Sequence, residues 1–353
     1  MNNLLKNKSA TLVLLLILIV VVVIIFNNFN PSRQTISKGV AQKSTATENL
    51  NPLSIQAMRE KDYLGSNLVI EQTLSNGVNY HQYIVSYLSE GLKIYGLLTV
   101  PVGDRPKDGW PVIIFNHGYI TPASYETYPT IGQYATYYPV FSRAGYIVFK
   151  PDFRGNGNSE GQPEGAYYSS AYATDDLNAI ASIKKYKDAN LNKIGVWGHS
   201  MGGNITLRDL VVDPKDIKAA VIWGGVVGSY SDLLNWHDSS YHPSIYELSL
   251  RNRYRSDLIN KYGTINSNST FWNSIDPTNF VGDIQAPVQL HVGELDEEVP
   301  TAFSQELYDK LKAAGKTAEY YEYPGANHNI SQGFNLAMQR SLSFFDKYLK
   351  GGE

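Results

Sequence analysis

The sequence has no cysteine among its 353 residues. Disulfide bonds, thiolate catalysis, cysteine-based metal sites and a lipid-modified N-terminal cysteine are therefore excluded. An excess of positive charge is also missing, because 30 Lys and Arg residues stand against 33 Asp and Glu residues and no basic run occurs. This balance argues against nucleic acid as the main partner.

The composition is that of a globular protein. Hydrophobic residues make up 43% of the chain and charged residues 18%, which is enough to build a large core. The length predicts about two domains, or one large α/β domain with attachments. Tyrosine is abundant, with 26 residues, and we expect many of these rings to line packing surfaces or a binding cleft.

The N-terminal region contains one long apolar run. Residues Ala10 to Phe26 carry no charge, and as a helix they would span roughly 26 Å, which is short but sufficient to cross a membrane. A cleaved signal peptide is the alternative, but its apolar part usually covers about 7–15 residues and ends at a small-x-small site. Asn27 to Pro31 provide no such site. We therefore expect an uncleaved transmembrane signal-anchor over residues 10–26.

The residues around this run predict its orientation and the domain organisation. Lys6 and Lys8 predict that residues 1–9 stay in the cytoplasm and that the rest of the chain lies outside, at the cell membrane. Residues 27–55 are rich in Ser, Thr, Asn and Gln without periodicity, which is typical of a flexible linker. A folded domain over residues 56–353 follows.

Most of this domain alternates between apolar and helix-like segments. Tyr80–Pro101 shows the alternation of a β-hairpin around Ser89–Gly91. The later segments are apolar on both faces, which is typical of parallel strands covered by helices. We expect strands at Val112–Asn116, Tyr146–Pro151, Ile194–Gly198, Ala219–Trp223, Val288–Val292 and Glu319–Tyr323, and helices near 130–143, 174–186, 201–212, 302–314 and 331–349. The expected fold is α/β with a mostly parallel central sheet, and its functional residues should collect at the carboxyl ends of the strands.

The strongest motif is Gly198-His199-Ser200-Met201-Gly202, which follows an apolar strand and precedes a helix. This Gly-x-Ser-x-Gly pattern in that context is typical of a nucleophile elbow. The serine of such a turn has a strained backbone, and the two glycines avoid collisions with the strand and the helix. The pattern predicts a nucleophilic serine at a helix N-terminus, whose N–H groups favour a developing anion. A glycine-rich turn with an incidental serine is the alternative.

A second glycine-containing turn, Asn116-His117-Gly118-Tyr119, follows the strand at Val112. Its backbone can direct the N–H of Tyr119 toward the space above the serine. With the N–H of the residue after the serine, Met201, it would form a two-donor oxyanion hole. A purely structural tight turn is the alternative. We expect the His117 ring to pack locally and not to react.

The segment Asp152 to Ser159, DFRGNGNS, ends the next strand. Its glycines suggest a phosphate-binding loop, but the Lys-Ser/Thr pair and the spacing of a dinucleotide fingerprint are missing. We therefore expect a structural loop beside the cleft, with a charge interaction between Asp152 and Arg154.

The regular alternation stops between residues 226 and 283, in a segment dense in aromatic and charged residues. Its position predicts a helical lid that shapes a substrate pocket. The arginines between 251 and 255 could receive a substrate carboxylate, and a solvated helix face is the alternative. His237 and His242 have no partner cluster, so no metal site is expected.

Two strand-end loops can supply an acid and a base. Four acidic residues follow the strand at Val288, and the loop position of Asp296 favours it as the acid that orients a histidine, with the other three solvated. His328 stands on a loop of small residues before the final helix, where its imidazole can swing over Ser200. The chain order Ser, Asp, His supports this choice.

The segments GHSMGG, NHGY, DFRGNGNS, GELDEEVP and GANHN, in this order, resemble the α/β-hydrolase superfamily. They are most similar to the catalytic domain of the prolyl oligopeptidase (S9) family and its stand-alone relatives, over about residues 80–350. The resemblance implies the α/β-hydrolase fold and the following roles: Ser200 as nucleophile, Asp296 as acid, His328 as base, and Tyr119 and Met201 as donors of the oxyanion hole.

Two features depart from the full peptidases of this family. They carry a large β-propeller that filters peptides, and residues 27–79 are too short to form one. The oxyanion loop also has the sequence His-Gly-Tyr-Ile where many relatives have His-Gly-Gly-Pro. Both departures leave hydrolase chemistry intact and concern peptide specificity.

The leading hypothesis is a membrane-anchored serine hydrolase that cleaves short peptides through an acyl-enzyme and needs no cofactor or metal. A carboxylesterase acting on small acyl esters is the alternative, because no propeller is expected. A catalytically inactive binding or scaffold protein with the same fold is the third possibility, although it has no chemical reason to retain the serine, the acid, the base and the elbow glycines together.

Overall fold

The structure is a computed structural model that describes residues 50–164, 166–236 and 245–351. The expected membrane anchor at 10–26 lies outside these residues, as do His237 and His242. Within the described part of the chain, no helix has both the length and the apolar character needed to cross a membrane.

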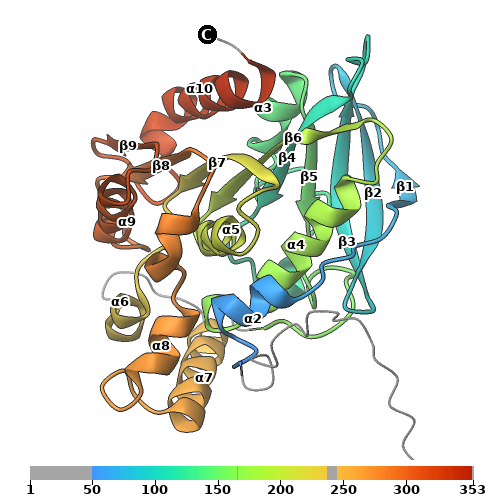
Figure 1. The fold of residues 1–353 in the computed structure, drawn as a ribbon. Helices are drawn as coiled ribbons and strands as arrows, with labels where there is room; N and C mark the ends of the chain where they lie inside the picture. The colour runs from blue at the N-terminus through green and yellow to red at the C-terminus, as the bar shows by residue number, and fades with distance from the viewer. Residues whose placement is uncertain (1–49, 165, 237–244, 352–353) are drawn as a thin grey trace, which may run out of the picture. The chain divides into compact units, whose positions relative to one another are not determined.

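A nine-stranded sheet forms the centre of the domain (Figure 1). The spatial order of its strands is β1 (Val69–Thr73), β2 (Tyr80–Ser89), β3 (Leu92–Pro101), β5 (Ile147–Pro151), β4 (Trp110–Asn116), β6 (Ala189–His199), β7 (Ile217–Trp223), β8 (Val288–Gly293) and β9 (Ala318–Tyr323). The pairs from β1 to β5 are antiparallel, and all pairs from β5 to β9 are parallel. The prediction of a mostly parallel sheet is confirmed.

Helices cover both faces of the sheet because its parallel strands are apolar on both faces. Along β4, Ile113 and Phe115 pack with the helices α3 (Tyr138–Arg143) and α10 (Phe334–Phe345), whereas Val112 and Ile114 belong to the core on the other face. That second face is covered by α4 (Ala171–Ile183), α5 (Met201–Val212) and α9 (Thr301–Ala313) (Figure 1). This two-sided cover confirms the expected α/β-hydrolase architecture.

Two local features differ from the expected elements. The helix expected at 130–143 begins only at Tyr138, because Gly132, Gln133 and Tyr134 have positive φ angles of 64°, 38° and 72° that a helix does not allow. The edge strand β1 was not expected, since all of its residues are exposed and it shows no alternation. A short helix α2 (Ile55–Glu60) precedes it, capped by the Ser54 side chain and anchored by the buried Ile55.

The insertion at 226–283 is helical in the part that the structure describes. It contains α6 (Tyr230–Asn235), α7 (Ile245–Tyr262), α8 (Ser269–Ile275) and the 3-10 helix η3 (Pro277–Asp283). Two side chains of α7 tie it to the loop before the 3-10 helix η2 (Ala166–Tyr168) and to α6. The Tyr254 hydroxyl donates to the carbonyl of Pro163 at 2.8 Å, and the Arg255 guanidinium donates to the carbonyl of Leu234. Arg255 therefore holds the backbone of the insertion and is not part of a fully solvated face.

The expected charge interaction between Asp152 and Arg154 is wrong. The Arg154 guanidinium pairs with Asp175 of α4 at 2.7 Å. Asp152 instead accepts a hydrogen bond from Tyr125 at 2.8 Å and lies 3.8 Å from the buried ammonium of Lys150. Both residues are buried, so each charge needs a partner. Arg154 finds its partner on α4, and the cation beside Asp152 is the ammonium of Lys150, two residues earlier in the chain.

Candidate active site

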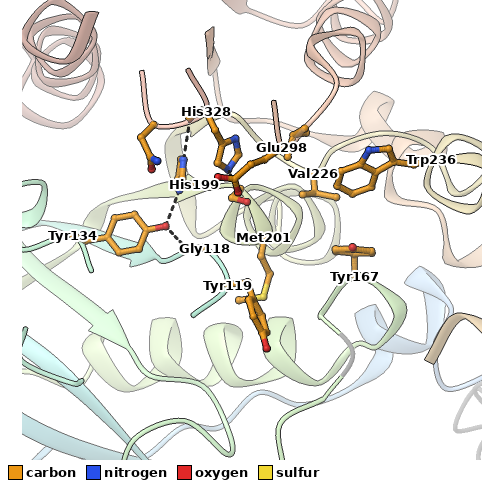
Figure 2. A pocket seen from close by; sticks show the side chains of 13 residues that line it. Gly118, Tyr119, Tyr134, Tyr167, His199, Met201, Val226, Trp236, Glu298 and His328 are labelled. Carbon is orange, nitrogen blue, oxygen red and sulfur yellow. Dashed lines mark hydrogen bonds and ion pairs between the residues drawn. The ribbon is translucent and has the colours of Figure 1, made fainter. Parts of the chain in front are cut away.

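A cavity of about 280 Å³ lies at the carboxyl ends of the parallel strands (Figure 2). Its walls come from the segments that follow β4, β5, β6, β7, β8 and β9, as expected for a sheet of this type. The lining residues are Gly118, Tyr119, Tyr134, Tyr167, His199, Ser200, Met201, Val226, Trp236, Glu298, Val299, His328 and Asn329.

Ser200 occupies a strained turn between β6 and α5. Its backbone has φ 54° and ψ −118°, which is unfavourable for a residue with a Cβ atom. Three backbone hydrogen bonds hold it there. Its N–H donates to Trp223 O at 3.0 Å, and its carbonyl accepts from the N–H groups of Gly203 at 2.9 Å and Val226 at 3.0 Å. The surrounding backbone therefore maintains the geometry that presents the serine to the cavity.

The two glycines of the motif are required by close packing. A Cβ atom on Gly198 would lie 2.4 Å from both Gly202 O and Thr206 Oγ1. A Cβ atom on Gly202 would lie only 2.0 Å from Asn116 O, at the end of β4. The strand, the turn and the first turn of α5 thus pack backbone to backbone, which no larger residue allows.

Asp296 and His328 are brought together from the loops after β8 and β9. The Nδ1 atom of His328 lies 2.8 Å from Oδ2 and 3.0 Å from Oδ1 of Asp296. The Oδ1 atom also accepts the N–H groups of Glu298 and Val299, each at 2.9 Å. On the other side of the ring, Nε2 of His328 has no hydrogen-bond partner among the described residues. His328 is thus held through Nδ1 alone, while Ser200 lines the same cavity.

The charge state of His328 reflects opposing effects. Burial lowers its pKa, but the hydrogen bond to Asp296 and the negative charges of Asp296, Glu298 and Glu297 together raise the pKa above the usual value of 6.5. Glu298 approaches most directly on the Nε2 side, where its Oε2 atom lies 3.7 Å away. The imidazole is therefore a stronger base than a free histidine.

The two expected oxyanion donors both line the cavity. Met201 is the first residue of α5, where backbone N–H groups have no partner within the helix. On the loop after β4, the N–H of Gly118 donates to the hydroxyl oxygen of Tyr134 at 2.7 Å. Since that N–H is already used, the next one along the loop, that of Tyr119, is the candidate donor on this side.

His117 packs locally, as expected. Its ring lies 4.8 Å from both the Tyr125 and Phe153 rings, and its Nδ1 atom bonds the Gly118 carbonyl at 2.7 Å. Burial and, to a smaller extent, the charge of Lys150 lower its pKa to about 3. The ring is therefore neutral near pH 7 and its nitrogens face backbone, which leaves it no role as a base.

Three residues at the cavity were not found from the sequence. Glu298 was expected to be solvated, but its side chain is 32% exposed and faces His328. Its position two residues after Asp296, on the same loop, is the only signal that could have indicated this. His199 was seen only as the variable residue of the serine motif, and Tyr134 lies in a segment that was expected to be helical.

No metal site is apparent around the cavity: across the residues that the structure describes, no group of three His, Cys, Asp or Glu side chains is arranged to hold an ion. The residues that line the cavity supply the hydroxyl of Ser200, the imidazoles of His199 and His328, the carboxylate of Glu298 and backbone N–H groups.

Comparisons with known proteins identify the family. The prolyl oligopeptidase family (Peptidase_S9) matches residues 133–352. The uncharacterized peptidase YtmA of Bacillus subtilis (strain 168) is 27% identical over 261 residues, which cover 74% of this chain and 91% of that protein.

Solved structures share the fold at low identity. An acetyl xylan esterase from Paenibacillus sp. R4 superposes with a TM-score of 0.62 at 17% identity, over 84% of this chain and 92% of that one. Dipeptidyl peptidase 4 of Porphyromonas gingivalis gives 0.57 at 18% identity, over 76% of this chain and 36% of that one. The chain belongs to the prolyl oligopeptidase (S9) family and is a serine hydrolase with the α/β-hydrolase fold.

Proposed function

We propose that Ser200, Asp296 and His328 form the catalytic triad of this hydrolase and that the enzyme cleaves short peptides through an acyl-enzyme. The observation that carries the proposal is the meeting of three strand-end loops at one cavity. A strained serine and a buried histidine line it, and the histidine is oriented by a carboxylate that the backbone fixes.

In the proposed reaction, Ser200 Oγ attacks the acyl carbon while Nε2 of His328 takes the hydroxyl proton. Asp296 stabilises the imidazolium that forms and keeps the ring in the correct tautomer. The negative charge on the acyl oxygen is received by the N–H groups of Tyr119 and Met201. His328 then protonates the leaving group, which departs. A water molecule, deprotonated by the same ring, attacks the acyl carbon, and the proton returns to Ser200 as the acid leaves.

The triad is tested by labelling the protein with a fluorophosphonate probe and comparing it with Ser200→Ala. We expect the native chain to be labelled and the variant not to be. His328→Ala should keep the fold and lose activity by orders of magnitude. Labelling that persists in Ser200→Ala, or activity retained in His328→Ala, would show that the wrong residues have been assigned.

A carboxylesterase acting on small acyl esters is the second candidate. Two observations favour it: the cavity, at about 280 Å³, lies at the small end of the range for ligand sites, and the superposed esterase from Paenibacillus covers nearly the same chain length. The family and the relative named as a peptidase favour peptide cleavage. Turnover of aminoacyl-naphthylamides without turnover of nitrophenyl esters would support the peptidase, and the reverse pattern would support the esterase.

We further propose that the helical insertion acts as a lid that shapes the substrate pocket. Trp236, which follows α6, forms part of the cavity wall and packs 6.4 Å, between ring centroids, from Tyr167 on the opposite loop. Figure 2 places these two rings at the end of the cavity away from Tyr134. Trp236→Ala should therefore change the preference among acyl groups of different size more than it changes the rate with the smallest one.

The sequence also supports anchoring of the enzyme in the cell membrane through residues 10–26, with the hydrolase domain outside the cytoplasm. Deletion of residues 1–26 should then move the activity from the membrane fraction to the soluble fraction. Protease added to intact cells should degrade the full-length protein. Protection of the full-length protein from that protease would refute the orientation.

A further inference from the structure

A chain of hydrogen bonds crosses the floor of the cavity beside Ser200 (Figure 2). It starts at the Gly118 N–H, which donates to the Tyr134 hydroxyl oxygen at 2.7 Å. That hydroxyl lies 2.7 Å from Nδ1 of His199. The Nε2 atom of His199 lies 3.3 Å from the backbone carbonyl of His328. The chain thus connects the proposed oxyanion loop to the loop of the proposed base through the residue before the nucleophile.

The direction of each bond in this chain is determined by its ends. Because the Gly118 N–H can only donate, the Tyr134 oxygen accepts, and its own proton is then available for Nδ1 of His199. The His328 carbonyl can only accept, so Nε2 of His199 carries the proton. Both requirements are met by the same neutral tautomer of His199. Burial, and then the charge of His328, lower the pKa of His199 well below 6.5, so the ring stays neutral while the base cycles.

The residues of this hydrogen-bond chain are closely packed against one another. A Cβ atom on Gly118 would lie 2.5 Å from the Tyr134 hydroxyl and 3.2 Å from both Nδ1 of His199 and Cβ of Ser200. A glycine is therefore required for the loop, the tyrosine and the serine turn to meet. His199 is 3% exposed, and its ring lies 4.6 Å, between centroids, from the ring of His328.

The backbone that presents Tyr134 is itself strained. Gln133 and Tyr134 both have positive φ angles, 38° and 72°, which are costly for residues with a Cβ atom. The ring is fixed by edge contacts with Phe115 and Trp197, at centroid distances of 5.5 Å and 6.1 Å. The strained backbone and the ring contacts thus place a hydroxyl that both accepts and donates a hydrogen bond beside the nucleophile.

We propose that Tyr134 and His199 are positioning residues that hold the Gly118–Tyr119 loop and the His328 loop in fixed relation to Ser200. This inference rests on the proposed triad. Neither side chain transfers a proton to the substrate in this role. The Tyr134 hydroxyl accepts the N–H of the His117–Gly118 peptide and so fixes the peptide immediately before the one that carries the Tyr119 N–H. His199 donates to the backbone carbonyl of the base, His328.

The test uses Tyr134→Phe in the full chain, with Tyr146→Phe as a matched control. The Tyr146 hydroxyl donates to Asp346 at 2.7 Å and lies near the amino end of β5, far from the cavity. Turnover of a nitrophenyl ester or an aminoacyl-naphthylamide is measured per serine labelled by the fluorophosphonate, so that loss of folded enzyme is not counted as loss of rate. The melting temperatures of both variants report any general destabilisation.

We expect Tyr134→Phe to lower kcat per labelled site by at least about 10-fold with KM within about twofold, because a displaced donor weakens transition-state binding only. Tyr146→Phe should leave both unchanged. Rates per labelled site within twofold of the native enzyme would refute the proposal. A loss of several hundred-fold would make the Tyr134 hydroxyl a direct oxyanion donor and would also overturn the positioning role.

A second pair of variants keeps the proposal testable if Tyr134→Phe folds poorly. His199→Gln retains a donor and an acceptor, whereas His199→Phe removes both. We expect kcat per labelled site to fall in the order native, Gln, Phe. Equal rates for the two variants would show that only the volume of the ring matters. Absence of label on the native protein would instead refute the proposed triad itself, so the two failures are distinguishable.

Discussion

Both oxygens of the Asp296 carboxylate lie near His328 Nδ1, Oδ2 at 2.8 Å and Oδ1 at 3.0 Å, and Oδ1 also accepts two backbone N–H groups from its own loop, each at 2.9 Å. The acid is therefore oriented by the backbone and does not depend on the histidine for its position. A side chain held in this way can fix the tautomer of His328 and stabilise its charged form during the reaction.

Replacing Asp296 with asparagine should test this arrangement. The amide oxygen can still accept the two backbone N–H groups, so the fold should survive. The NH₂ group would then face Nδ1 and impose the wrong tautomer on His328. We expect kcat to fall by roughly 10³–10⁴-fold with little change in melting temperature. Asp283→Asn, at an exposed ion pair with Arg59, serves as the control. A decrease of less than about tenfold would argue against Asp296 as the acid.

The carboxylate of Glu298 should shift the pH dependence of the reaction. A general base must be neutral, so kcat/KM falls as the pH drops through the raised pKa of His328. Glu298→Gln removes a negative charge 3.7 Å from Nε2, which lowers that pKa. The acidic limb should therefore move to lower pH, by roughly 0.5–1 unit given the partial exposure of the pair.

The control for this shift is Glu297→Gln, which makes the same charge change on the neighbouring residue. Glu297 contributes less than Glu298 to the raised pKa of His328. Its substitution should thus move the acidic limb less. The measurement is kcat/KM between pH 5 and 8 for the three proteins. An acidic limb that stays in place in Glu298→Gln would mean that this charge is screened from the base.

The elbow glycine Gly202 should tolerate no side chain. The Cβ atom of Gly202→Ala would lie 2.0 Å from Asn116 O. That oxygen and the backbone of residue 202 are closely packed. This clash can be relieved only if α5 moves away from β4. That movement should destabilise the fold by about 1–3 kcal/mol and displace Ser200. We expect a lower melting temperature together with loss of fluorophosphonate labelling. Gly282→Ala, at a position without a positive φ where a Cβ atom meets nothing within 4 Å, is the matched control and should change neither property.

The sequence predicted the six parallel strands and the serine motif because both depend on local patterns. β4, for example, is buried along almost its whole length, and such runs of apolar residues have few other interpretations. Tyr134 could not be found in this way, since its role depends on positive φ angles in a segment with helix-like composition. The charge partners of Arg154 were missed for a related reason, because Asp175 reaches it from another element.

Two acidic residues, Asp176 on α4 and Asp209 on α5, are fully buried. Two buried carboxylates that interact repel each other when both are charged, so we expect the pair to share one proton. Asn116 at the end of β4 donates to Asp176 at 3.0 Å. Burial raises the pKa of Asp176 to about 6. Burial and the charge of Asp176 raise the pKa of Asp209 well above its usual value. Arg208 opposes the shift at Asp209, and Asp213 adds to it.

Because these carboxyls hold protons more tightly in the folded state than in the unfolded chain, the stability that they contribute is present at low pH and is lost as the pH rises through about 6. Asp209→Asn supplies a permanent donor to Asp176 and removes the need for the shared proton. The melting temperature of Asp209→Asn minus that of the native protein should therefore increase from pH 5 to pH 8. The expected increase is at least roughly 2–4 °C, which is the shift that a change of about 1 kcal/mol in the free energy of unfolding produces in a domain of this size. The control is Asp188→Asn, near the surface, which should show no such trend. If the melting temperatures of the native protein and Asp209→Asn change with pH in parallel, the shared proton is contradicted.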